Sequence, residues 1–265
     1  MTGKKEKIEV SVIDVSGKKL FCVNGYEEVE LEFERCYQAG DRIRIVIQED
    51  GFLKIRLDES MEEAVVFGKE GVFDYLIPAR EEKEAYSPQA FMGEHHKIIV
   101  RHHVKDTGLV NLSQNVWDVR GKSAFYPHCT ATVETRGEAV FAARNTIDGM
   151  TETKGHGMWP FTSWGEGEDA DAEIRIDFGR PVLVEEVQIF LRADFPHDNY
   201  WKEAELVFSG GKTKKLSLEK TGEAQKFGIE NILTEWVVMK NLKKDESDSS
   251  PFPALTQWVV LGRNV

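Results

Sequence analysis

Short segments in which polar and apolar residues alternate constrain the fold of this chain more than any other feature. In the first half they cover residues 8–13, 20–23, 29–33, 41–47, 52–57, 72–77 and 97–104. In the second half they cover residues 131–134, 172–178, 184–191, 204–208, 215–218, 225–229, 235–239 and 257–261. A period of two places successive side chains on opposite faces of a strand, so each segment predicts a strand with one buried face.

Helical patterns are scarce in the same sequence. Residues 58–66 carry at most weak helical spacing, and only residues 138–145 predict a short helix. There is no amphipathic segment of helix length to cover a parallel sheet. The pattern therefore predicts an all-β fold of two tandem β-sandwich (jelly-roll) domains, the first over residues 1–118 and the second over residues 119–265.

The charge balance narrows the classes of partner. The 265 residues have a formal net charge of −12, which disfavours binding to a phosphate backbone or to an anionic membrane surface. We expect a neutral or weakly charged ligand, no nucleic acid and no membrane, while homo-oligomerisation stays open. Because no apolar export segment and no run of about 18 apolar residues occurs, a cytoplasmic location is predicted. Cys22, Cys36 and Cys129 lack metal-type spacing and are expected to be buried free thiols.

One stretch of the second half has a characteristic order of motifs. An Asp148-Gly-Met-Thr151 turn leads into a tryptophan-rich loop that contains Trp164, and the next strand closes in an Asp-Phe-Gly that ends at Gly179. This order resembles the discoidin-type, galactose-binding-like β-sandwich of many carbohydrate-binding modules, and the resemblance covers residues 124–265. It implies that loops at one end of the second sandwich carry the ligand, and that Trp164 is a core residue beneath them.

Aromatic and polar residues gather on the predicted loops of this second half. A flat tryptophan stacks on the apolar face of a pyranose, while Arg, Asp and His side chains supply directional hydrogen bonds to its hydroxyls. The sequence therefore predicts a non-catalytic site for a neutral mono- or oligosaccharide, with Trp159 as the stacking surface. The predicted site residues are His156, Trp159, Arg192, Asp194, His197, Asp198 and Trp201.

The charged members of this set have a structural alternative. Arg192 with Asp194, and His197 with Asp198, are close enough in sequence to form ion pairs that hold a long loop. A neighbouring acidic segment, residues 165–171, is expected to be solvated.

Two other classes of function stay open. His128, Glu134, Arg136 and Glu138 form an alternative polar cluster. A sugar-acting enzyme would gather such His, Asp and Glu side chains in a cleft between the domains, although no zinc-type spacing supports this. A protein-interaction or assembly module would instead present a large apolar patch and a symmetric dimer.

The turn at Asp148 is also a candidate calcium loop. The resemblance implies a structural Ca²⁺ held through Asp148 and Thr151, and oxygen ligands at short spacing suit that ion. Related modules often add a carboxylate near the last strand, where this chain has the amide Gln257. Losing a charged ligand weakens such a site, and an Asp-Gly turn closed by a side-chain hydrogen bond is the alternative.

Overall fold

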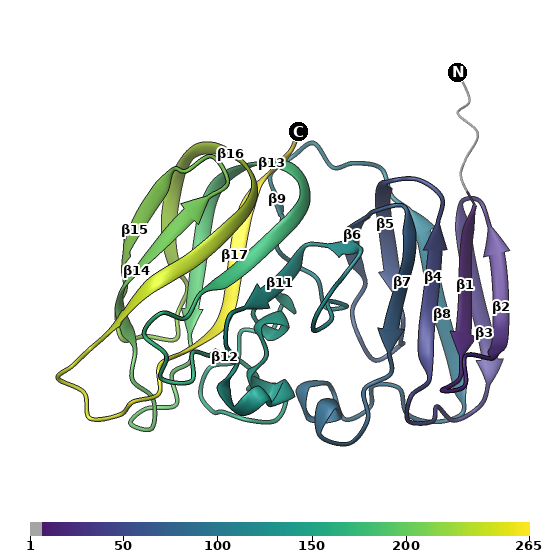
Figure 1. The fold of residues 1–265 in the computed structure, drawn as a ribbon, viewed down its shortest axis with the longest axis horizontal. Helices are drawn as coiled ribbons and strands as arrows, with labels where there is room; N and C mark the ends of the chain where they lie inside the picture. The colour runs from purple at the N-terminus through teal and green to yellow at the C-terminus, as the bar shows by residue number, and fades with distance from the viewer. Residues whose placement is uncertain (1–6) are drawn as a thin grey trace.

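Two β-sandwiches lie side by side along the long axis of the molecule (Figure 1). The structure is a computed structural model that describes residues 7–265. The all-β prediction is confirmed, since the helices among the described residues are short 3₁₀ turns.

The first sandwich packs a four-stranded sheet, ordered β2-β1-β4-β7, against a five-stranded sheet, ordered β10-β6-β5-β8-β3. Its elements are β1 (Ile8–Ile13), β2 (Lys19–Gly25), β3 (Glu28–Glu34), β4 (Arg42–Ile47), β5 (Gly51–Arg56), β6 (Ala64–Gly68), β7 (Gly71–Leu76), η1 (Arg80–Ala85), β8 (His95–His102) and β10 (Phe125–Tyr126). Buried side chains from both sheets form a single core.

Alternation in the sequence explains these strands directly. Strand β3 reads Glu-Val-Glu-Leu-Glu-Phe-Glu, and every second residue of it is buried. Val29, Leu31 and Phe33 therefore enter the core, while the glutamates between them face solvent.

The second sandwich is one eight-stranded sheet. Six of its strands follow the order β12-β17-β13-β16-β14-β15, and the other two, β11 and β9, pair with β13 and β17. Its elements are β9 (Val110–Asn111), β11 (His128–Ala131), η2 (Thr135–Gly137), η3 (Ala139–Phe141), η4 (Ala143–Ile147), β12 (Trp164–Gly165), β13 (Ile174–Leu191), β14 (Trp201–Phe208), β15 (Thr213–Ser217), β16 (Gln225–Lys244) and β17 (Ala254–Asn264). It encloses a separate core.

Two strands of the second sandwich are longer than the alternation predicts. β13 runs for 18 residues and β16 for 20, and each merges two predicted strands. In β13 the backbone of Gly179 has a φ of 67°, and the register with β16 shifts between Asp177 and Val182. The local Gly-Arg-Pro sequence therefore bends the strand as a bulge does, without taking the chain out of the sheet.

The segment that joins the sandwiches crosses between them repeatedly. β9 pairs with β17 of the second sandwich, Trp117 is then buried in the first core, and β10 pairs with β6 of the first sandwich. The predicted boundary after residue 118 falls inside this crossing segment.

The sequence predicted one short helix, over residues 138–145, and only weak helical spacing over residues 58–66. Within residues 58–66, the Asp58 carboxylate accepts the backbone N–H groups of Ser60 and Phe91, which anchors a loop, and β6 follows it. Within residues 138–145, the chain forms the 3₁₀ turns η3 and η4 instead of an α-helix.

The cysteine prediction needs a partial correction. All three cysteines are free thiols, but only Cys129 is buried, and Cys22 and Cys36 are exposed. Cys22 lies on β2, at the edge of its sheet, where one side of the strand meets solvent.

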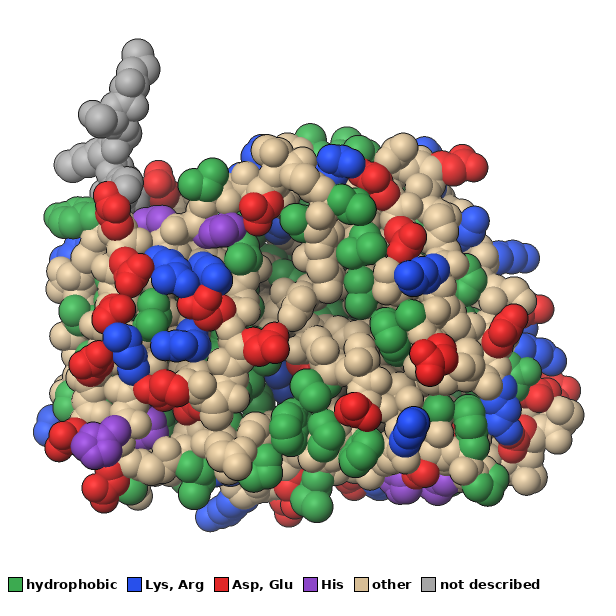
Figure 2. All heavy atoms as spheres, turned by 180° about the vertical axis from the view of Figure 1, so that it is seen from behind, with side chains coloured by type: hydrophobic (Ala, Val, Ile, Leu, Met, Phe, Trp, Pro, Cys, Tyr) green, Lys and Arg blue, Asp and Glu red, His purple; other side chains and the backbone are tan. Residues whose placement is uncertain are grey.

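The surface shows no segregation of charge on the face drawn in Figure 2. Acidic and basic side chains intermingle there, and the surface is hollowed between the two sandwiches. Among residues 7–265, no helix has both the length and the apolar character needed to cross a membrane.

Candidate functional site

Loops at one end of the second sandwich enclose a cavity of about 360 Å³, which we call the end-loop cavity. Three residues of the predicted sugar site, His156, Arg192 and His197, meet in its wall. The other lining residues are Thr135, Arg136, Phe141, Gly165, Glu166, Gly167, Glu168, Pro251, Phe252, Pro253 and Ala254.

Arg192 is fixed where the chain leaves β13. Its backbone N–H donates to the carbonyl of Ala254 at 2.9 Å. Its guanidinium donates to the Asp198 carboxylate, from Nη2 at 2.6 Å and from Nε at 3.0 Å to each oxygen. The two side chains are only 6% and 0% exposed, so this buried pair holds the loop between them in one conformation.

The alternative pairing of Arg192 with Asp194 was wrong. The backbone N–H of Asp198 donates to the carbonyl of Asp194 at 3.0 Å, and the resulting turn brings the Asp198 carboxylate to the guanidinium. Asp194 instead forms a hydrogen bond with Nδ1 of His156. The predicted contact of His197 with Asp198 is present at 3.0 Å.

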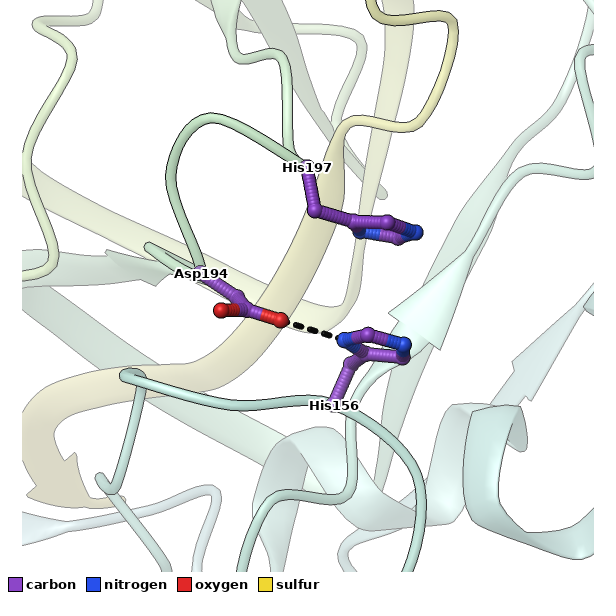
Figure 3. Close-up of side chains that lie close together, drawn as sticks. All are labelled: His156, Asp194 and His197. Carbon is purple, nitrogen blue, oxygen red and sulfur yellow. Dashed lines mark hydrogen bonds and ion pairs between the residues drawn. The ribbon is translucent and has the colours of Figure 1, made fainter.

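Two histidines from separate loops stack at the rim of the end-loop cavity. The ring centroids of His156 and His197 are 4.1 Å apart, with an angle of 6° between the planes. Each Nδ1 atom faces a carboxylate, that of Asp194 or Asp198. Figure 3 shows the other nitrogens of the two rings at the same end, pointing away from Asp194. In the neutral ring, a proton on Nδ1 leaves Nε2 as an acceptor.

Two aromatic residues that line the cavity, Phe252 and Phe141, were not predicted from the sequence. Phe252 is 43% exposed and its ring stacks on His197, with centroids 5.4 Å apart and planes inclined by 17°. Phe141 lies beneath the guanidinium of Arg192, 5.7 Å from Cζ to the ring centroid. The available signal for Phe252 was its position between Pro251 and Pro253, directly after a polar loop.

Glu168, Asp169 and Asp171 of the acidic loop are exposed, as expected, but Glu166 is buried. Glu166 is 7% exposed and accepts a hydrogen bond from Nε1 of Trp201 at 2.8 Å. Burial raises the pKa of Glu166 to about 7, although the bond from Trp201 opposes the shift. Near neutral pH this carboxyl is therefore protonated in part of the molecules and can donate a hydrogen bond to a ligand.

The three tryptophans that the sequence analysis singled out have different roles. Trp164 is fully buried, which confirms it as a core residue. Trp201 is also fully buried, with its ring 5.9 Å from that of Trp164, so its prediction as a ligand contact was wrong. Trp159 lines a different cavity, of about 200 Å³, together with Tyr86 and Asp148. Its place away from the end-loop cavity follows from its backbone N–H, which donates to the carbonyl of Glu84 at 2.8 Å.

The alternative polar cluster does not assemble into one site. His128 is buried, with Nδ1 2.6 Å from Asp118 and Nε2 2.7 Å from the carbonyl of Gly121. Glu134 accepts hydrogen bonds from Arg120. Arg136 and Glu138 pair with each other, and of the four residues only Arg136 lines the end-loop cavity. His128 is thus already engaged and does not join His156 and His197.

The candidate calcium loop forms the alternative structure, an Asp-Gly turn closed by a side-chain hydrogen bond. Oδ1 of Asp148 accepts the backbone N–H of Met150 at 2.8 Å, which closes the turn. Burial raises the pKa of Asp148 to about 7, and the nearby buried cation Arg144 opposes this shift. Thr151 is exposed, while the amide of Gln257 is buried without a hydrogen-bond partner among the described residues. A fixed positive charge beside the main carboxylate fits a divalent cation poorly.

Comparison with known proteins supplies a fold resemblance and no family. No protein-family model matches the sequence, and a search of curated proteins finds no match. Among solved structures, a fucose-binding module of Streptococcus pneumoniae is 12% identical and matches 57% of this chain and 96% of its own, with a TM-score of 0.41. Chitosan-binding module 1 from a chitosanase/glucanase of Paenibacillus sp. IK-5 is 18% identical and matches 58% and 99%, with a TM-score of 0.37. A family 32 carbohydrate-binding module from C. perfringens, in complex with galactose, is 17% identical and matches 50% and 91%, with a TM-score of 0.38.

These solved structures are carbohydrate-binding modules. The resemblance stated from the second half of the sequence is to modules of the same kind. The sugars that their descriptions name are ligands of those proteins.

Proposed function

We propose that the end-loop cavity binds a neutral mono- or oligosaccharide without catalysis. The observation that carries this proposal is the combination, in one cavity, of a flat exposed aromatic ring with polar groups held in fixed positions. The volume of the end-loop cavity, about 360 Å³, lies in the range of small-molecule sites. This proposal keeps His156, Arg192 and His197 from the predicted site and replaces Trp159 with Phe252 as the stacking surface.

The apolar contact comes from Phe252. Its ring is supported from behind by His197, so little side-chain freedom is lost when a ligand packs against it. The C–H face of a pyranose is apolar and suits such a ring.

The polar contacts come from Arg192, the two histidines and Glu166. Of the five N–H groups of a guanidinium, Arg192 uses Nε and one on Nη2 for Asp198, and one on Nη1 for Ser163 at 3.4 Å. Donors thus remain for sugar hydroxyls, beside the acceptor nitrogens of His156 and His197. Because the Arg192 charge is already balanced by Asp198, the cavity favours a neutral ligand over an anion.

A calorimetric titration against a panel of neutral monosaccharides tests the proposal. We expect a dissociation constant between about 10 μM and 1 mM for at least one sugar. Phe252→Ala should weaken binding about tenfold, which is what the loss of one aromatic contact of roughly 1.4 kcal/mol produces. Leu233→Ala, at an exposed apolar residue on β16, is the control and should bind as the wild type does. The proposal fails if no sugar binds, or if Phe252→Ala and the control bind alike.

Calcium at Asp148 and Thr151 stays a prediction, as do self-association and the absence of nucleic-acid and membrane partners. Thermal unfolding in calcium and in chelator tests the first. A midpoint that is the same in both would contradict calcium binding.

A further inference from the structure

Three metal-ligating side chains converge beside the end-loop cavity. His156, Asp194 and His197 each offer one ligand atom, and these atoms all lie within 4.8 Å of one another. The side chains come from two loops, one before β12 and one after β13 (Figure 3). They are 41%, 30% and 42% exposed. An ion can therefore reach all three from solvent.

We propose that His156, His197 and Asp194 bind a divalent transition-metal ion, with zinc as the best match. Imidazole nitrogens suit Zn²⁺, Cu²⁺ and Ni²⁺, and a carboxylate oxygen is a common third ligand for zinc. Three protein ligands leave a fourth position of a tetrahedral ion for water or another molecule. The inference needs no sugar in the cavity, so it stands or falls separately from the proposed function.

The spacing of the ligand atoms permits such a site after a small movement. With metal–ligand bonds of about 2.0–2.1 Å, two ligands of a tetrahedral ion lie about 3.3 Å apart. Ligand atoms now within 4.8 Å must therefore approach by at most about 1.5 Å. Because the two rings are stacked with 6° between their planes, at least one imidazole must also turn out of the stack so that its in-plane lone pair points at the ion. His156 and His197 are on loops, and Gly155 and Gly157 flank His156, so no strand has to move.

The surroundings orient the ligands. Oδ1 of Asp198 lies 3.0 Å from Nδ1 of His197, and Arg192 holds that carboxylate in place. Oδ2 of the same carboxylate accepts the backbone N–H of Asp194 at 2.8 Å. Outer contacts of this kind commonly position metal ligands. The neighbouring cation Arg192 is neutralised by its pair with Asp198, so it does not repel the ion.

Metal binding also has a defined proton balance. The hydrogen bond between His156 and Asp194 holds a proton that lies on Nδ1 when the ring donates. The ion takes its place, so Nδ1 becomes a ligand and the proton is released to solvent or moves to the other ring nitrogen. No oxidation or reduction is involved with zinc.

Titration of the untagged full-length chain with Zn²⁺, and separately with Co²⁺ as a spectroscopic probe, tests the proposal. We expect one ion per chain and the intense visible absorption of four-coordinate cobalt. His156→Ala and His197→Ala should each weaken zinc binding about 100-fold, and Asp194→Asn about tenfold. Far-ultraviolet circular dichroism of each variant checks that the fold is unchanged.

Two matched controls separate this site from other binding. His95→Ala removes an exposed histidine on β8 and should leave zinc affinity unchanged. Glu59→Gln alters a second group of ligand-type residues, Asp58, Glu59 and His96, in the first sandwich, and should also leave it unchanged. The proposal is overturned if the wild type binds no zinc below about 1 mM, or if His156→Ala binds as tightly as His95→Ala. It is also overturned if Glu59→Gln, and not His156→Ala, abolishes binding.

Discussion

At the scale of single residues, Glu166 is a buried carboxyl in the wall of the end-loop cavity. Its carboxyl is buried against Trp201, and burial raises its pKa from 4.5 to about 7. The folded state therefore holds a proton on Glu166 over a pH range in which the unfolded chain has released it. The sign follows from this difference, because stability falls with rising pH wherever the folded state binds more protons.

Glu166→Gln should remove this pH dependence. Between pH 4.5 and about 7, the wild type should lose up to about 3 kcal/mol of unfolding free energy relative to the variant, since each pKa unit corresponds to about 1.4 kcal/mol. Urea unfolding at several pH values measures the difference. Glu168→Gln, at an exposed residue of the same loop, is the control. Its free energy of unfolding should change with pH as that of the wild type does. Parallel curves for Glu166→Gln and the wild type would contradict the buried, protonated carboxyl.

At the scale of elements, β13 and β17 approach each other so closely that one position requires glycine. A Cβ atom on Gly262 would lie 2.1 Å from the carbonyl oxygen of Leu183 and 2.7 Å from a side-chain carbon of Leu112. The register between the strands shifts close by, between Val184 and Glu186, and the bulge accounts for the close approach. A backbone oxygen in a paired strand cannot move aside as a flexible side chain does.

Gly262→Ala should therefore destabilise the second sandwich by about 2–3 kcal/mol, the upper range for overpacking. Gly228→Ala is the matched control. Gly228 lies on β16, which also pairs with β13, and a Cβ atom there would meet open space. It should be neutral or stabilise by up to about 1 kcal/mol, as alanine restricts the unfolded chain. Chemical denaturation of both variants measures the contrast, and equal stabilities would refute the close approach.

At the scale of the whole molecule, Arg180 links the two sandwiches. It lies on β13 of the second sandwich, and its guanidinium carbon is 4.7 Å from the ring of Phe52 and 5.2 Å from that of Phe67, both in the first. Hydrogen bonds to Asn264 hold it there. Burial lowers its pKa to about 10, so the charge is partly desolvated at the contact, which strengthens its attraction to the rings.

Arg180→Ala should lower the interaction free energy between the two sandwiches by about 1–2 kcal/mol. In scanning calorimetry we expect the unfolding of the first sandwich to move down by roughly 3–10 °C and to separate from that of the second. Arg175→Ala is the control, since Arg175 also lies on β13 but covers Trp236 within the second sandwich. If Arg175→Ala separates the transitions as much as Arg180→Ala does, Arg180 is not a link between the sandwiches.

Much of the architecture could be predicted from the sequence by itself. Alternation identified most strands, since it depends only on neighbours along the chain, and it led to the all-β fold. It could not show that β13 continues through Gly179, because pairing with β16 and β17 outweighs a local turn signal. The burial of Trp164 was also predictable from the order of the motifs.

The composition of the site was decided by the tertiary structure. The sequence indicated His156, Arg192 and His197, because rare polar residues on loops are noticeable without coordinates. It could not show that Asp198, and not Asp194, is the partner of Arg192. Nor could it show that Phe252 stacks on His197 or that Trp159 lines a different cavity. Contacts between loops depend on the path of the backbone through space. That path is set by turns and strand ends far apart in the sequence, and no local pattern records it.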